Sequence, residues 1–174
     1  MGLENGRVKR LSHDKANIIA MYHILLSTHS LFRWLVLATL LYAIVTAYKG
    51  WFSNQVFTKF DNNVRHITAT VAHIQLTFGI WLYFVSPIAN YFMHNFQHGL
   101  KLREIRFFGM EHGFMMIIAI TVINIGSAKA KRKSIDKEKF KTIAIWFTIG
   151  LLIIFSSIPW QFSLLISRPY FRAF

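Results

Sequence analysis

A run of apolar residues in the second half of the chain, residues 107–126, is long enough to cross a lipid bilayer. Its first third nevertheless carries Glu111 and His112, an acid and an imidazole, inside the hydrocarbon region. Ionisable side chains at that depth are costly, and in membrane proteins they face the interior of a helix bundle and mark functional sites. The rest of the chain must therefore supply helices that cover these two side chains.

Composition supports a membrane protein. The 174 residues are 54% hydrophobic and only 16% charged, whereas a soluble domain carries roughly 25% charged residues. The net charge of +13 comes from basic residues that punctuate apolar runs, as in membrane proteins, so nucleic-acid binding is not expected. Cysteine is absent, which excludes disulfides and thiolate metal sites. Any metal or haem must be held by histidine, methionine or carboxylate.

Four apolar stretches predict an all-α integral membrane protein, a four-helix up-down-up-down bundle surrounded by membrane lipid. Pro159 is expected to bend the fourth helix near its end. The longer connection between the second and third helices, residues 88–104, is expected to hold a short interfacial helix. The four spans, which together make one transmembrane domain over residues 21–174, lie at about 21–48, 64–85, 105–126 and 140–165.

Residues 1–20 are polar and basic, and they predict a tail outside this domain. They lack the apolar core and cleavage site of a signal peptide, and Met21 is an alternative start of the protein. Basic residues are densest in the loop 129–141. This density predicts a cytoplasmic loop and therefore places both termini in the periplasm.

Three of the eight histidines lie inside the predicted spans: His29, His73 and His112. At about 1.5 Å per residue, His29 lies roughly 12 Å and His112 roughly 9 Å from the same membrane face. The first and third helices are diagonal partners in such a bundle, so we expect these two imidazoles to meet in its core. Two facing imidazoles can supply both axial ligands of one b-type haem. The alternative is that the histidines only make polar contacts between helices.

Further polar groups near this pair have candidate roles. Arg33 lies one turn beyond His29 on the same helix face, where it can meet a haem propionate or pair with Glu111. Glu111 can also orient a ligand imidazole or carry protons near a quinone, although adjacent positions on a helix point about 100° apart.

Two glycines, Gly109 and Gly113, flank His112 at a spacing of four residues. They would let a flat macrocycle approach the helix, and close helix packing explains the same spacing. His73 lies nearer the middle of the membrane, roughly 21 Å from the end of its helix. It is expected to form an interhelical hydrogen bond.

The motifs around these residues resemble a family of small four-span membrane proteins of Bacteroidetes-type bacteria, commonly labelled "cytochrome B". By position, the resemblance implies roles for His29 and Arg33 in H-S-x-x-R-W, His73 in A-H-x-Q, and Glu111 with His112 in F-F-G-x-E-H. It also implies a b-type haem and a respiratory setting. The resemblance covers nearly all of the chain after the polar N-terminal stretch, and its strongest segments are THSLFRWLVL (28–37), DNNVRHITATVAHIQLTFGIWLYFVSP (61–87) and RFFGMEHGFMMIIAITVINIGSAKAKRK (106–133).

These features predict a b-type cytochrome-like electron-transfer subunit of the bacterial inner membrane, with one haem between His29 and His112. It would pass electrons between quinol and a partner protein. No nucleotide- or flavin-binding domain fits in 174 residues, so other membrane subunits are expected rather than a stand-alone enzyme. The alternative is a haem-free scaffold or accessory subunit whose basic loop 129–141 binds a partner or anionic lipid. A proton or ion path through Arg33, Glu111 and His73 is disfavoured, because broken helices and an inverted repeat are absent from the sequence.

Overall fold

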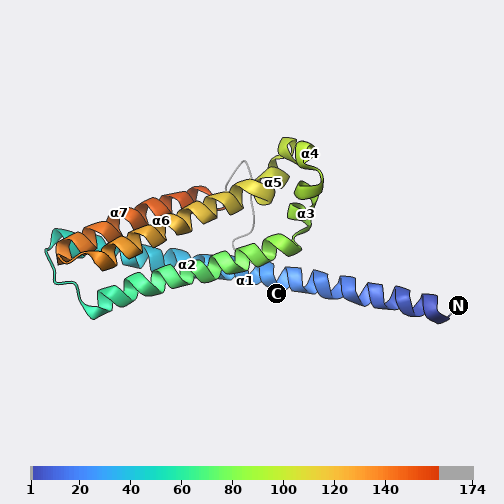
Figure 1. Cartoon of the computed structure of the whole chain (residues 1–174), viewed down its shortest axis with the longest axis horizontal. Helices are drawn as coiled ribbons and strands as arrows, with labels where there is room; N and C mark the ends of the chain where they lie inside the picture. Colours follow the sequence, from blue (N-terminus) through green and yellow to red (C-terminus); the bar gives the residue numbers. More distant parts are fainter. Residues whose placement is uncertain (1, 161–174) are drawn as a thin grey trace.

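The protein is an all-α bundle (Figure 1). The computed structural model describes the backbone of residues 2–160 and the side chains of residues 16–160. No strand occurs over these residues. The elements are α1 (Gly2–Phe52), α2 (Lys59–Val85), α3 (Pro87–His94), α4 (Phe96–Lys101), α5 (Arg103–Arg106), the π turn η1 (Phe107–Glu111), α6 (His112–Arg132) and α7 (Asp136–Ser156).

Four helical segments are long and apolar enough to cross a membrane, which confirms the predicted multi-pass, four-helix transmembrane bundle. They are Ala16–Phe52, Lys59–Val85, Arg103–Arg132 and Asp136–Ser156. α1 packs against α2 and α7, and α6 packs against the same two helices. α1 and α6 are therefore diagonal across the bundle, and the links α1–α2 and α6–α7 lie together at one end (Figure 1).

The helix ends differ from the prediction at both extremes of the chain. The polar stretch 1–20 is helical and continuous with the first span, because α1 begins at Gly2 and continues without a break to Phe52. α7 ends at Ser156 rather than bending at Pro159. Proline lacks the N–H that a helix needs and disfavours helical backbone at the residue before it. Residues 161–165 of the predicted fourth span lie outside the described residues.

The predicted interfacial helix between α2 and α6 is replaced by the three short helices α3, α4 and α5. α2 ends at Val85 because Ser86 and Pro87 follow. The Ser86 hydroxyl accepts a hydrogen bond from the backbone N–H of Ala89, and Pro87 occupies the first turn of α3, where its missing N–H is harmless. The chain therefore crosses the end of the bundle before it enters α6 (Figure 1).

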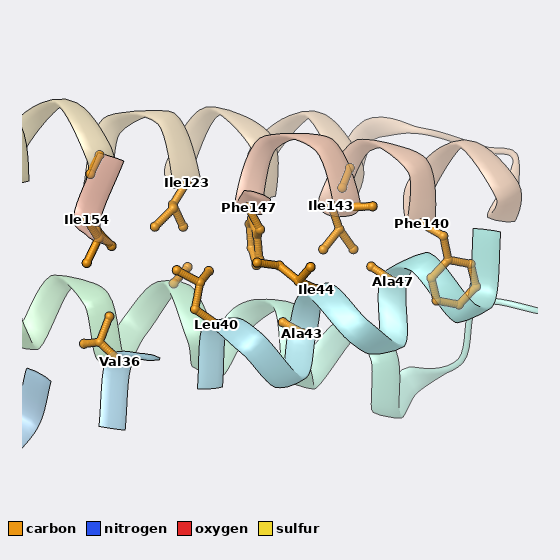
Figure 2. Close-up of a cluster of buried hydrophobic side chains, with 14 of the residues drawn as sticks. Val36, Leu40, Ala43, Ile44, Ala47, Ile123, Phe140, Ile143, Phe147 and Ile154 are labelled. Carbon is orange, nitrogen blue, oxygen red and sulfur yellow. The ribbon is translucent and has the colours of Figure 1, made fainter. Parts of the chain in front are cut away.

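A close-packed apolar core joins α1, α6 and α7 (Figure 2). Its largest fully buried side chains are Leu40, Ile123, Phe140 and Phe147. Small residues let these helices approach closely, as is usual in membrane bundles. A Cβ atom added to Gly126 would lie 2.2 Å from Cβ of Trp146. This close packing fixes α6 and α7 against each other. It therefore also fixes the ends of both helices that reach the candidate site.

Candidate functional site

His29 of α1 and His112 of α6 meet in the interior of the bundle. Their ring centroids lie 6.3 Å apart and their planes cross at 79°, an edge-to-face arrangement. The two helices are diagonal partners, so the pair bridges the centre of the bundle rather than an outer helix–helix contact. The structure thus brings together the two histidines that the sequence placed at a common depth.

The orientation of His112 is set by the end of α7. Nδ1 of His112 lies 2.9 Å from the backbone oxygen of Ser157, the C-cap residue that follows the last residue of α7. Carbonyl groups at a helix C-terminus lack partners within the helix, so this oxygen is available. Because a carbonyl only accepts, Nδ1 carries the proton and Nε2 keeps its lone pair. Metal-binding histidines are generally held in this way by a hydrogen bond from the other ring nitrogen.

His29 is held by α2. The side-chain amide of Gln75 donates to the backbone oxygen of His29 over 2.9 Å. The imidazole of His29 lies against Gly79, where an added Cβ atom would be 3.1 Å from Cε1 and 3.6 Å from Nδ1. Nδ1 of His29 and Oε1 of Gln75 are buried and have no hydrogen-bond partner within residues 16–160. Buried polar atoms are normally satisfied, so the site has unused capacity to bind a polar or metal-containing ligand.

The contact with Gly79 gives a testable prediction about how His29 is positioned. We expect Gly79→Ala to displace the His29 ring by a few tenths of an ångström, because a Cβ–carbon approach of 3.1 Å is tighter than ordinary van der Waals contact of about 3.5–4.0 Å. The tryptophan fluorescence and any absorbance of a ligand at the site should change, with a small effect on thermal stability. Ile80→Ala, on an exposed neighbouring position, is the control. Identical spectra for Gly79→Ala and the wild type would show that Gly79 does not position His29.

A π turn, η1, leads directly into His112. The backbone N–H of His112 donates to the oxygen of Phe107, five residues earlier, instead of the usual four. Such single π turns occur frequently at functional sites. The rings of Phe107 and Phe108 lie 5.6 and 6.4 Å from the His112 ring and form an apolar wall beside it. Nothing in the residue pattern of this segment predicts the π turn.

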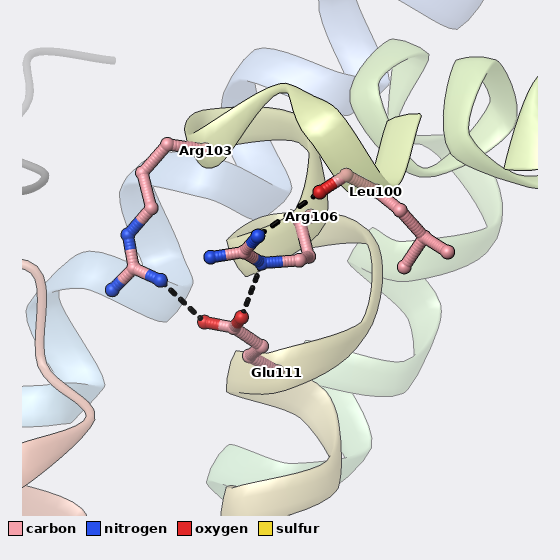
Figure 3. A network of polar contacts seen from close by, with 4 residues as sticks. All are labelled: Leu100, Arg103, Arg106 and Glu111. Atoms are coloured by element: carbon pink, nitrogen blue, oxygen red, sulfur yellow. Dashed lines mark hydrogen bonds and ion pairs between the residues drawn. The ribbon is translucent and has the colours of Figure 1, made fainter. Parts of the chain in front are cut away.

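Glu111 points towards Arg103 and Arg106 (Figure 3). Its carboxylate pairs with Nε of Arg106 at 2.7 Å and with Nη1 of Arg103 at 3.3 Å. Arg106 also donates to the backbone oxygen of Leu100 over 3.0 Å. Both carboxylate oxygens are thus bound to α5, whereas the sequence had suggested Arg33 as one possible partner of Glu111. Its direction follows from the angle of about 100° between adjacent helical positions.

Arg33 of α1 lies beside the aromatic ring of its neighbour Trp34. Its guanidinium carbon lies 5.2 Å from the centroid of the Trp34 ring, within the range of a cation–π contact. The Trp34 ring in turn lies 6.3 Å from that of Trp160. These aromatic contacts keep a positive charge one turn from His29.

His73 belongs to a different part of the bundle. Its Nδ1 donates to the backbone oxygen of Ala69 over 2.8 Å, and Nε2 lies 2.8 Å from Nδ2 of Asn124. Both ring nitrogens are therefore used, and the second bond joins α2 to α6. Asn124 lies three turns along α6 from His112, roughly 18 Å away. Asn124 was not identified from the sequence, because a lone amide in an apolar span has no local signature.

The two glycines that flank His112 differ in their surroundings. A Cβ atom added to Gly109 would lie 2.5 Å from Cβ of Phe92, and the Gly109 oxygen accepts a hydrogen bond of 2.8 Å from the Tyr83 hydroxyl. Phe92 of α3 fills the space that was predicted for a macrocycle at Gly109. Beside Gly113, an added Cβ atom would meet nothing within 4 Å. Only Gly113 leaves open space next to His112.

The donor set of the site is two imidazoles. Over the described residues, no group of three or more histidine, cysteine, aspartate or glutamate side chains could hold a metal ion. No protein-family model, curated protein or solved structure matches the chain.

Proposed function

We propose that the chain is a b-type cytochrome-like subunit of the bacterial inner membrane that holds one haem between His29 and His112. The observation that supports this most is the separation of the two rings, 6.3 Å between centroids. His29 and His112 would hold the haem iron, each through one ring nitrogen, and metal–nitrogen bonds of about 2 Å would suit a separation of this size.

The surrounding residues fit this cofactor chemically. His112 already has the tautomer that leaves Nε2 free, and its hydrogen bond to Ser157 raises the basicity of the ring. Open space lies beside Gly113, and Arg33 offers a cation for a propionate. When bound, haem supplies one-electron chemistry, while Phe107 and Phe108 exclude water from the His112 side.

The resemblance to the small four-span "cytochrome B" family supports the same function. We propose that the subunit passes electrons between quinol and a partner protein, and that other membrane subunits provide the remaining domains. His112 is the first residue of α6, directly after α5 and η1, and His29 lies against it. The pair is therefore at the end of the bundle where the short helices α3–α5 cross (Figure 1). In the proposed topology this is the periplasmic end, because the basic loop 129–141 would be cytoplasmic.

An absorbance spectrum of the purified full-length chain tests the proposal. We expect a reduced-minus-oxidised difference spectrum of a six-coordinate b-type haem and a stoichiometry of one haem per chain. The protein should be produced in haem-replete cells and titrated with haem after purification, so that incomplete loading is corrected. A folded, monodisperse protein that stays colourless under both conditions would contradict the proposal.

The second candidate function is that of a haem-free scaffold or accessory subunit. The observation that favours it lies at the opposite end of the bundle. Lys129 lies 4.5 Å from the Trp146 ring centroid and Lys141 lies 5.8 Å from that of Trp51. Such lysines on aromatic rings give a fixed cationic surface at the α6–α7 link, which suits binding of a partner. A colourless protein that still assembles with other membrane subunits would favour this candidate.

A further inference from the structure

A hollow of about 300 Å³ lies at the end of the bundle opposite the histidine pair. It is formed where the α1–α2 link and the start of α2 meet the end of α6 and the start of α7. This volume is at the lower limit for small-ligand sites in proteins, roughly 300–1,000 Å³. Six of the residues that line it are Phe57, Thr58, Lys59, Asn62, Lys131 and Lys139.

Three of the residues that line the hollow are lysines. Lys59 and Lys131 form no ion pair within residues 16–160, so their charges are available to a ligand. Lys139 pairs with Asp136 at 2.8 Å. In the described part of the chain, no other acidic side chain forms an ion pair with any of these three lysines. Three ammonium groups around one hollow attract an anion.

A fourth cation lies behind the hollow. Arg65 is only 6% exposed, and it donates to Oδ1 of Asn62 over 2.9 Å and to the backbone and side-chain oxygens of Ser127. No acidic side chain pairs with it within residues 16–160. Its buried charge adds to the positive potential that the lysines create, because buried charges are screened less than exposed ones. Since the oxygen of Asn62 is used, its amide N–H groups remain as donors.

The surroundings of the hollow favour a lipid over a soluble anion. Apolar residues are exposed around the α1–α2 link beside it: Phe52 at the end of α1, Val56 in the link and Phe60 at the start of α2 are 71%, 74% and 61% exposed. The hollow lies where transmembrane helices begin and end, at the level of lipid headgroups. Basic pockets between transmembrane helices bind anionic headgroups in this way.

We propose that the hollow lined by Lys59, Asn62, Lys131 and Lys139 binds the phosphate headgroup of an anionic phospholipid. Phosphate oxygens accept from the lysine ammonium groups and the Asn62 amide, and the acyl chains lie along the exposed apolar residues around the α1–α2 link. Thr58 is not counted among the donors, because its hydroxyl is bonded to Asp61 over 2.6 Å. The site is independent of whether the histidine pair holds haem.

The experiment compares lipid binding of two double variants that remove the same charge. Full-length protein in mixed micelles is titrated with phosphatidylglycerol or phosphatidylcholine, and bound lipid is measured by native mass spectrometry. Lys59→Gln/Lys131→Gln should weaken phosphatidylglycerol binding about 30-fold, since each lysine near a membrane surface contributes about 1 kcal/mol. Phosphatidylcholine binding should not change. The control, Lys129→Gln/Lys137→Gln, alters lysines at the same end that do not line the hollow and should retain the preference.

Three outcomes would overturn the proposal. Equal losses in both double variants would mean that loop charge in general attracts the lipid. An unchanged affinity in the hollow variant would mean that the lipid binds elsewhere. Displacement of phosphatidylglycerol by inorganic phosphate at equal concentration would make a free anion the ligand. If the double variant does not fold, Lys131→Gln alone, an exposed side chain near the end of α6, should give a loss of roughly fivefold.

Discussion

His29→Ala and His112→Ala are each expected to reduce the haem content of the purified protein to background, whereas His73→Ala retains it. In the proposed site one imidazole would not suffice for six-coordinate iron, and each alanine removes one of the two imidazoles that meet there within residues 16–160. His73 instead bonds Ala69 and Asn124, three turns away along α6. The measurement is the ratio of haem to protein, with the reduced-minus-oxidised spectrum.

A histidine-to-methionine variant separates ligation from folding. His112→Met keeps a side chain that can bind haem iron, and a histidine–methionine pair has a higher reduction potential. We therefore expect His112→Met to retain part of the haem with a raised potential, while His112→Ala stays colourless but folded. Loss of haem in His73→Ala alone would mean that the two ligands have been wrongly assigned.

Gly126→Ala is expected to destabilise the bundle by about 1–3 kcal/mol, the usual effect of overpacking a tight core. The new Cβ atom would lie 2.2 Å from Cβ and 2.9 Å from Cγ of Trp146. Cβ of Trp146 is bonded to the backbone and cannot rotate away, so α6 and α7 must separate. Thermal unfolding in detergent, followed by helical circular dichroism, should show a lowered midpoint.

Gly113→Ala is the matched control for this substitution. It makes the same change on the same helix, but its added Cβ atom meets nothing within 4 Å. Alanine is a better helix former than glycine by roughly 0.5–1 kcal/mol, so the midpoint should stay the same or rise. Equal midpoints for the two variants would show that the α6–α7 contact adjusts without loss. In haem-loaded protein, a weaker affinity of Gly113→Ala would indicate that the macrocycle lies against this open position.

The arrangement of the helices followed from the sequence because bilayer thickness fixes the length of apolar runs. Short links between them then forced alternating directions, and diagonal helices had to be the first and third. The depths of His29 and His112 could be counted along those helices. Their meeting in the interior is therefore the part of the site that a residue count could predict.

The details that hold the pair could not be predicted in the same way. The acceptor for His112 is a backbone oxygen at Ser157, and any residue type at a helix end provides one. The space for His29 comes from Gly79, whose role appears only when α2 is placed beside α1. The direction of Glu111 depends on Arg103 and Arg106, which the π turn and α5 bring together. Each of these depends on tertiary placement rather than on local pattern.

The off-centre position of the histidine pair has an electrical consequence. Along α6, His112 lies roughly 30 Å from Arg132 but only roughly 14 Å from Arg103 at the other end of the segment. An electron exchanged from the α3–α5 side would traverse a minor fraction of the transmembrane voltage, which represents about 2.3 kcal/mol per elementary charge for each 100 mV. If the pair holds the proposed redox centre, electron transfer from this side would respond to only about a third of the membrane potential, roughly 0.7 kcal/mol for each 100 mV.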